Sequence, residues 1–160
     1  MPSEDRLLRD HLLELLRGGS AHADSVTALK SFPVELRGKK PEGAPYSAWQ
    51  LLEHLRIAQH DILEFCVNSH YLAPKWPDEY WPKAESPGSE EEWDASVKGF
   101  HADLREVEKL VQEEPGNLYA KIPWGEGQTI LREILLVADH NAYHLGQLVL
   151  LRKLLDAWKG

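Results

Sequence analysis

The chain has 160 residues, and its 26 Asp and Glu outnumber its 18 Lys and Arg, which gives a formal net charge of −8. This length predicts a single domain over residues 1–160 that can bury a core without disulfides or structural metal. A hydrophobic content of 42% and a charged content of 28% are typical of a globular protein and exclude a disordered one. The acidic balance also argues against a partner with a phosphate backbone, so nucleic-acid binding is not expected.

The chain has one cysteine, Cys66, so it cannot form an internal disulfide. Its first ten residues, MPSEDRLLRD, lack the cationic start and the apolar run of a secretory signal. We therefore expect a cytoplasmic protein.

The N-terminal part predicts one long helix and one short one. Leucines recur at helical spacing over residues 7–16, Ser3 is suited to cap the helix start, and Gly18-Gly19 ends the pattern. A short helical stretch is expected over residues 23–31. Lys, Pro and Gly dominate residues 35–45, which we interpret as a connection.

Capping signals mark the next two helices. The string SAWQ at residues 47–50 is a capping box and predicts a helix from there to about Val67. The string SEEE at residues 89–92 repeats the signal, and an apolar stripe follows it as far as Val111. This third long helix is expected to end before Pro115-Gly116.

The last helix is expected over about residues 129–158. Asp139 is its only formally charged residue between residues 134 and 151. A membrane span is an alternative, but the polar residues in its middle make a lipid-facing helix unfavourable. We expect burial on several sides and a homodimer that uses the outer surface of this helix and of the first one. Gly146, which costs about 1 kcal/mol relative to Ala in a helix, is interpreted as a point of close helix approach.

Four long amphipathic helices without a convincing strand predict an all-α, four-helix bundle. The sequence excludes two known kinds of metal site that are built on helices. No Glu has a His three residues later, as a di-iron carboxylate bundle requires, and the His-Glu-x-x-His motif of zinc proteases is absent.

His140 and His144 are four residues apart on the last helix, so they project from one face, one turn above the other. Their ring nitrogens can converge on one ion. The surrounding helix is almost free of charge, where an unpaired imidazole would be costly, so both rings need partners. Two interpretations stay open at this point: a metal-binding pair, or two hydrogen-bonded core histidines.

A third ligand has to come from another helix. His54 interrupts the apolar stripe of the second helix, whereas His60 points about 120° away and is expected in solvent. Three neutral imidazoles suit Zn, Ni or Fe(II), and a set of three leaves positions open, as in catalytic sites. The alternative for His54 is a satisfied core or boundary histidine.

Helix angle also suggests two residues that would support such a site. Gln147 is seven residues after His140 and Asp61 is seven after His54, so each shares a face with a histidine. Gln147 would orient a water, and Asp61 would accept a proton from it or from an imidazole. An interhelical hydrogen bond is the alternative for both residues. Cys66 is interpreted as a small buried hydrophobe.

The connection over residues 68–88 is longer than a bundle needs, and long ordered loops are often functional. It contains four aromatic residues: Tyr71, Trp76, Tyr80 and Trp81. These side chains either cover the metal pocket or cover the end of the bundle. Trp124, from a later connection, is a further candidate for the same group.

Three strings carry a resemblance to a known family: SAWQLLEHLRIAQHDILEF (47–65), KWPDEYWP (75–82) and TILREILLVADHNAYHLGQLVLLRKLL (129–155). They resemble the DinB-like family, also called the DinB/YfiT-like metalloenzymes, in the right order and over nearly the whole chain. The resemblance implies a four-helix bundle that holds a divalent metal on three histidines. By the motif, these ligands are His54, His140 and His144.

The resemblance implies less about the reaction. Some relatives transfer or isomerise substrates with low-molecular-weight thiols such as mycothiol, bacillithiol or glutathione, and others are treated as hydrolases. We expect a metal-dependent enzyme acting on a small molecule, with thiol-dependent transfer ranked before hydrolysis. Zn or Ni is the expected metal, with Fe or Mn as alternatives. A stress-related binding protein with a vestigial or structural metal site is the alternative to an enzyme.

Overall fold

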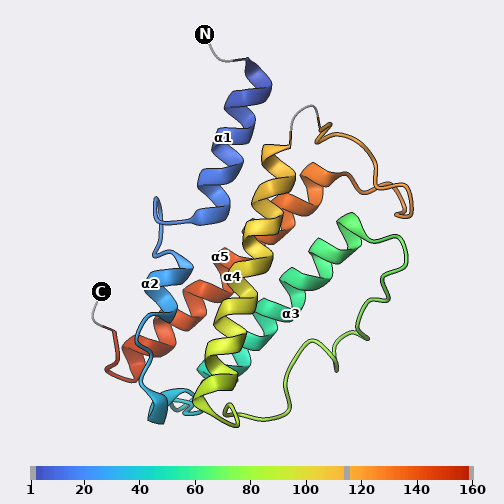
Figure 1. Cartoon of the computed structure of the whole chain (residues 1–160). Helices are drawn as coiled ribbons and strands as arrows, with labels where there is room; N and C mark the ends of the chain where they lie inside the picture. Colours follow the sequence, from blue (N-terminus) through green and yellow to red (C-terminus); the bar gives the residue numbers. More distant parts are fainter. Residues whose placement is uncertain (1–2, 114–115, 159–160) are drawn as a thin grey trace.

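The computed structural model describes residues 3–113 and 116–158, which form helices joined by loops (Figure 1). The helices are α1 (Glu4–Arg17), α2 (Ser25–Leu29), the short 3-10 helix η1 (Val34–Leu36), α3 (Ala48–Val67), α4 (Glu90–Gln112) and α5 (Ile130–Leu154). Within these residues no strand forms, and an isolated bridge pairs Lys121 with Thr129. The prediction of an all-α fold is confirmed.

Three long helices make most of the bundle, and the fourth position is divided. Helix α3 packs against both α4 and α5, while α1 packs against α4 and α5 and the short α2 packs against α5 (Figure 1). The capping box that predicted α3 is present, because the Ser47 hydroxyl accepts from the amide of Gln50 and the Gln50 side chain accepts from the amide of Ser47. The predicted caps Ser3 and Ser89 are likewise formed.

The boundaries of three helices need comment. Helix α2 is shorter than the expected stretch 23–31. Helix α5 ends at Leu154 instead of near Trp158, because the chain reverses where Asp156 takes a left-handed φ of 55°. Pro115, the expected stop signal after α4, lies outside the described residues.

A polar layer divides the apolar core. Along α5, residues 134–138 pack in one cluster and residues 145–151 in another. Between them Asn141 donates from Nδ2 to Oε1 of Gln59 at 2.8 Å, and Nε2 of Gln59 donates to the carbonyl of Phe100 at 2.7 Å. These bonds join α5, α3 and α4 at the level of the predicted histidine pair.

The outer face of α5 remains open to solvent, so burial on several sides was only partly correct. Leu135, Tyr143 and Leu150 are 44%, 65% and 57% exposed. A Cβ placed on Gly146 would meet nothing within 4 Å, so the interpretation of this glycine as a close approach of helices within the chain is wrong. Among the described helices, none combines the length and the apolarity that crossing a membrane requires.

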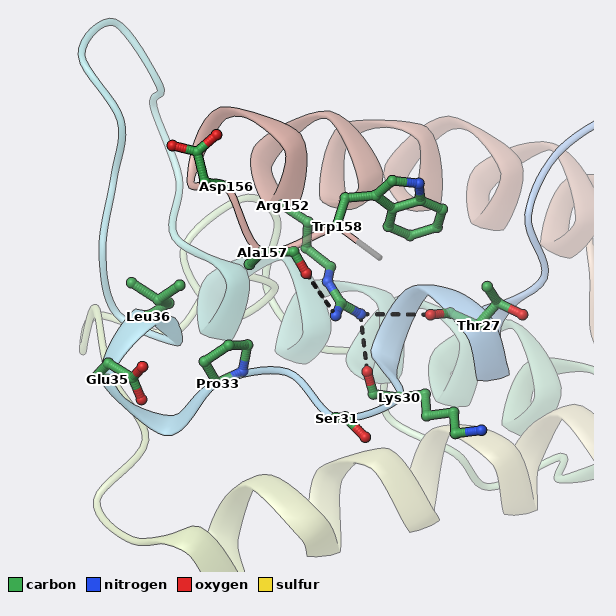
Figure 2. Close-up of a pocket in the computed structure, with 10 residues that line it drawn as sticks. All are labelled: Thr27, Lys30, Ser31, Pro33, Glu35, Leu36, Arg152, Asp156, Ala157 and Trp158. Carbon is green, nitrogen blue, oxygen red and sulfur yellow. Dashed lines mark hydrogen bonds between the residues drawn. The ribbon is translucent and has the colours of Figure 1, made fainter. Parts of the chain in front are cut away.

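Arg152 holds the chain end against α2. Its guanidinium donates hydrogen bonds to the carbonyls of Thr27, Lys30 and Ala157 (Figure 2). It also lies 5.0 Å from the ring centroid of Phe32. These contacts satisfy carbonyls at the C-terminus of α2 and after α5, and Arg152 lines a cavity of about 570 Å³.

Arg9 of α1 has the same role at the opposite end of the bundle. Its Nε donates to the Asp5 carboxylate at 2.7 Å, and Nη1 donates to the carbonyls of Val111 and Glu113 at 2.6 and 3.2 Å. Nη2 donates to the carbonyl of Gly116. One buried guanidinium therefore caps the C-terminus of α4 and ties α1 to it.

Candidate metal centre

The structure brings together the three histidines that the sequence singled out. His54 lies on α3, and His140 and His144 lie one turn apart on α5. Their ring centroids form a nearly regular triangle with sides of 4.9, 4.5 and 4.6 Å. One nitrogen from each ring lies within 4.8 Å of the others, so the three rings are able to hold a single metal ion.

The protein fixes the protonation of two of these rings. Nδ1 of His54 donates to the backbone carbonyl of Tyr80 at 2.9 Å, and Nδ1 of His144 donates to Oε1 of Gln147 at 2.7 Å. Since both acceptors are oxygens, the protons stay on Nδ1. Each Nε2 therefore carries a lone pair instead of a proton, which is the form in which histidine binds metal.

His140 is held differently. Its Nε2 lies 3.1 Å from Nε2 of His54, and its Nδ1 is buried without a hydrogen-bond partner among the described residues. Two imidazole nitrogens that bind one tetrahedral ion at about 2.1 Å lie roughly 3.4 Å apart, so the observed spacing is close to that of a shared ion. The residues present therefore fit a divalent metal.

The electrostatics keep the cluster neutral. Burial, followed by the charges of His144 and His54, lowers the pKa of His140 to about 3. Burial also lowers the pKa of His54 and of His144. Uncharged imidazoles at neutral pH are available as ligands, and a protonated ring in this layer would repel its neighbours.

Aromatic rings cover one side of the cluster. Trp81 stacks on His54 with 3.8 Å between ring centroids and 7° between planes, and Tyr46 stacks on the other face of the indole at 3.9 Å. Of the two roles left open for the loop 68–88, covering the site is the one found for its last part. Trp76 is 71% exposed and contacts Tyr80 edge-on.

Asp61 supports this loop rather than the histidines. The hydroxyl of Tyr80 donates to the Asp61 carboxylate at 2.7 Å, while the carbonyl of the same tyrosine holds His54. Burial and then the nearby Asp61 carboxylate raise the pKa of Tyr80. Within the described residues Asp61 makes no direct hydrogen bond to the three rings, so its expected role as a proton acceptor for them has no direct contact behind it.

Gln147 contacts the cluster, although not through the residue that suggested it. Its position was inferred from a shared face with His140, but its amide oxygen binds His144, three residues before it. Asn141 makes an interhelical hydrogen bond to Gln59 and none to the histidines among the described residues. Tyr143 stands edge-on to His144 at 4.9 Å and is largely exposed.

The remaining sequence candidates lie outside the cluster. His60 points away as expected, but it is only 45% exposed because its Nδ1 contacts the Asp103 carboxylate on α4 at 3.0 Å. Cys66 is buried. Trp124 donates from its indole nitrogen to the carbonyl of Phe65 at 2.7 Å, near the other end of α3, and so does not join the aromatic cover.

Two supporting groups were not found from the sequence. The Tyr80 carbonyl leaves no signal because every residue has a carbonyl. Tyr46 stands directly before the helix cap Ser47, and only the path of the loop brings it to Trp81. A pattern search for aromatic residues next to capping boxes would have marked it.

One of three comparisons with known proteins gives a match. Residues 8–148 match a protein-family model described as the DinB superfamily. No curated protein is significantly similar to the chain, and neither is any solved structure. Metal ligation by the three histidines stays a prediction.

Proposed function

The chain belongs to the DinB superfamily, and from the geometry of its histidines we propose that it is a metal-dependent enzyme acting on a small molecule. The proposed ligands of a single divalent ion are His54, His140 and His144. Zn or Ni suits three imidazoles best, with Fe or Mn as alternatives. Three protein ligands leave at least one position for a substrate, as in catalytic sites.

One observation carries the proposal. The lone pairs of His54 and His144 are directed by hydrogen bonds on the opposite side of each ring, to the Tyr80 carbonyl and to Gln147. Metal-binding histidines in proteins are characteristically supported in this way, because the second hydrogen bond fixes both tautomer and ring orientation. Histidines that only fill a core need no such convergence.

We rank thiol-dependent transfer before hydrolysis. A bound dication supplies a Lewis acid that makes a thiol or a water give up its proton near neutral pH. The chain's own thiol is unsuited to act, because burial, followed by the charge of Glu133, raises the pKa of Cys66 to about 12. A reacting thiol would therefore come from a small molecule. Trp81 and Tyr46 would exclude water on one side of it.

The metal site is tested first. Protein purified without a His-tag and loaded with Zn should contain about one ion per chain by elemental analysis. His140→Ala and His144→Ala should abolish binding, whereas His60→Ala, a matched histidine on α3 outside the cluster, should leave it unchanged. Equal metal content in wild type and all variants would show that the site is wrong.

The reaction class is tested on Co(II)-substituted protein. Low-molecular-weight thiols should change its visible d–d spectrum, and His54→Ala should remove that response. In a Cys66→Ala variant, the same thiols should change the d–d spectrum as much as they do in the wild type. A spectrum unchanged by every physiological thiol would favour the hydrolase, or a binding protein without turnover.

We also propose a homodimer. The exposed face of α5 carries Leu135, Tyr143 and Leu150, and α1 exposes Leu7 and Leu15. Exposed apolar side chains on one helix favour a second copy as the cover, because symmetric dimers bury identical patches. Light scattering at micromolar concentration should give twice the 18.2 kDa mass of one chain. A mass of one chain would refute the dimer.

A further inference from the structure

We infer that a second feature, a cavity of about 320 Å³ beside the histidines, binds the apolar part of the substrate, and that Gln147 connects it to the metal centre. The inference rests on the proposed function and names the substrate class of that same site. The cavity lies between the connection at residues 42–46 and the C-terminal half of α5. Its volume is within the range of small-molecule sites.

The two helices that carry the cluster also line the cavity. Leu51 lines it and stands about one turn before His54 on α3, and Gln147 lines it about one turn after His144 on α5. The same two helices therefore supply the wall of the cavity and the metal ligands. A molecule in the cavity lies beside the cluster on the same pair of helices.

Gln147 belongs to both places. Its amide oxygen accepts the Nδ1 proton of His144, whereas its amide nitrogen has no hydrogen-bond partner within the described part of the chain. An amide nitrogen carries two donors. They are available to an acceptor on a molecule in the cavity, so a ligand there would contact the group that orients a metal ligand.

The aromatic cover is shared in the same way. Tyr46 lines the cavity and stacks on Trp81, and Trp81 stacks on His54. The Tyr46 ring therefore has one face on the stack over the cluster, while its residue forms part of the cavity wall. A ligand that fills the cavity would contact Tyr46, which is part of this stack.

The lining defines the chemistry of the ligand. Apart from Glu42, no residue that lines the cavity carries a formal charge, and most of the wall is apolar: Pro45, Tyr46, Leu51, Leu150, Leu151 and Leu154. An anion would find no cation to bind. The expected ligand is an uncharged, largely apolar molecule with one hydrogen-bond acceptor at the Gln147 end.

A larger cavity, of about 570 Å³, does not fit this role. Its charged lining residues are Lys30, Glu35, Arg152 and Asp156, and the Arg152 guanidinium already donates to four carbonyls, three of which are drawn in Figure 2. None of its lining residues belongs to the histidine cluster or contacts it through a hydrogen bond given above. Its polar groups hold the end of α5.

The test uses prodan, an uncharged naphthalene ketone whose emission shifts to the blue in apolar surroundings. Metal-free protein should bind one prodan per chain. Leu150→Glu places a charge on the cavity wall and should lower the affinity at least tenfold. Leu135→Glu is the matched control, because Leu135 is a comparably exposed leucine of α5 outside the cavity. The prodan affinity of this variant should stay within twofold of the wild-type value.

Three results would overturn the inference. Unchanged prodan binding in Leu150→Glu would place the dye elsewhere. Equal losses in both leucine variants would mean that the dye binds the general outer face of α5 or a dimer contact. Absence of binding by the wild-type protein would show that the cavity does not accept this class of ligand.

Two substitutions of Gln147 separate its two contacts. Gln147→Glu keeps an oxygen for His144 but replaces the donor with a carboxylate, so prodan affinity should fall about tenfold while Zn affinity is retained within a few-fold. Gln147→Leu removes the acceptor, so Zn affinity should fall 10- to 100-fold, roughly the range for lost supporting contacts. Equal behaviour of the two variants in both assays would overturn the link.

The outcome is distinguishable from failure of the proposed function. Prodan binding is measured without metal, and metal content is measured without prodan. A protein that binds prodan in the cavity but no metal would refute the metal-dependent enzyme alone. A protein that binds one metal ion but no prodan would refute the cavity assignment alone.

Discussion

Arg9 and the histidine cluster are both polar groups buried between helices, but their bonding differs. The three nitrogens of the Arg9 guanidinium donate to four oxygens. One belongs to the Asp5 carboxylate, and the other three are carbonyls at or beyond the end of α4. In the cluster, two Nε2 atoms face one another at 3.1 Å, and Nδ1 of His140 has no partner among the described residues. All three guanidinium nitrogens of Arg9 have oxygen partners, whereas the cluster keeps one ring nitrogen without a partner among the described residues.

Under the proposed function, this difference separates a structural role from a functional one. A buried polar group that serves the fold is normally hydrogen-bonded, because an unmade bond costs about 1–3 kcal/mol. Unused bonding capacity in a buried group needs an explanation, and a bound ion is one such explanation. The comparison therefore predicts that substituting Arg9 changes stability, and that substituting His140 changes metal binding.

The largest expected effect is on metal affinity. His140→Leu should reduce Zn content from about one ion per chain to none, because two imidazoles hold a dication far more weakly than three. In the metal-free protein, the free energy of unfolding of this variant should lie within about 1 kcal/mol of the wild-type value, because an apolar side chain replaces a polar one that lacks a hydrogen bond at Nδ1. Elemental analysis and urea unfolding measure the two effects. A large loss of stability without metal would assign His140 a structural role.

The second effect has the opposite pattern. Arg9→Met should lower the free energy of unfolding by about 3 kcal/mol, because it leaves carbonyls at the end of α4 without a donor. Zn stoichiometry should not change at temperatures where the variant is folded. Urea unfolding of metal-free protein provides the measurement. Arg17→Met is the control, since Arg17 is an exposed partner of Glu108 and should cost little.

The two regions also differ in how far the sequence predicted them. The histidines were found because helix geometry turns a spacing of four into a shared face, and because His54 interrupts an apolar stripe. Arg9 gave no comparable signal. Three of its partners are carbonyls about a hundred residues away, and a carbonyl is present at every position.

Loops account for most of the remaining differences. The long helices and their caps followed from periodicity and from Ser47 and Ser89. The Tyr80 carbonyl and the Tyr46–Trp81 stack depend on the path of connections that have no period to read. Asp61 is a further example. The sequence predicted that it shares a helix face with His54, but its carboxylate accepts a hydrogen bond from Tyr80 of the loop.

A third prediction tests how strongly the loop supports the cluster. Tyr80→Phe removes the hydroxyl that donates to Asp61 and keeps the ring and the carbonyl that holds His54. A less firmly held carbonyl should weaken Zn binding about tenfold, at the lower end of the range for supporting contacts. Competition with a chromophoric chelator measures the affinity. Tyr71→Phe is the comparison, and an equal loss in that variant would point to the Asp61 environment instead of the His54 contact.

The smallest effect concerns Gly146, where the predicted close approach of helices within the chain is wrong. A Cβ there meets nothing within 4 Å, and the residue is not among those with positive φ, so Ala can adopt the same backbone. Gly146→Ala should therefore raise the free energy of unfolding by about 0.5–1 kcal/mol in dilute solution.

Gly99 of α4 is the matched control for this substitution, because its Cβ would lie only 3.3 Å from Cδ of Arg56, so Gly99→Ala should gain less. Urea midpoints measured at nanomolar concentration compare the two variants as monomers, and a lower midpoint for Gly146→Ala would contradict the open space. The proposed dimer adds an opposing contribution at higher concentration. If the second copy packs across Gly146, the added methyl group should weaken the dimer in light scattering even while it stabilises each chain.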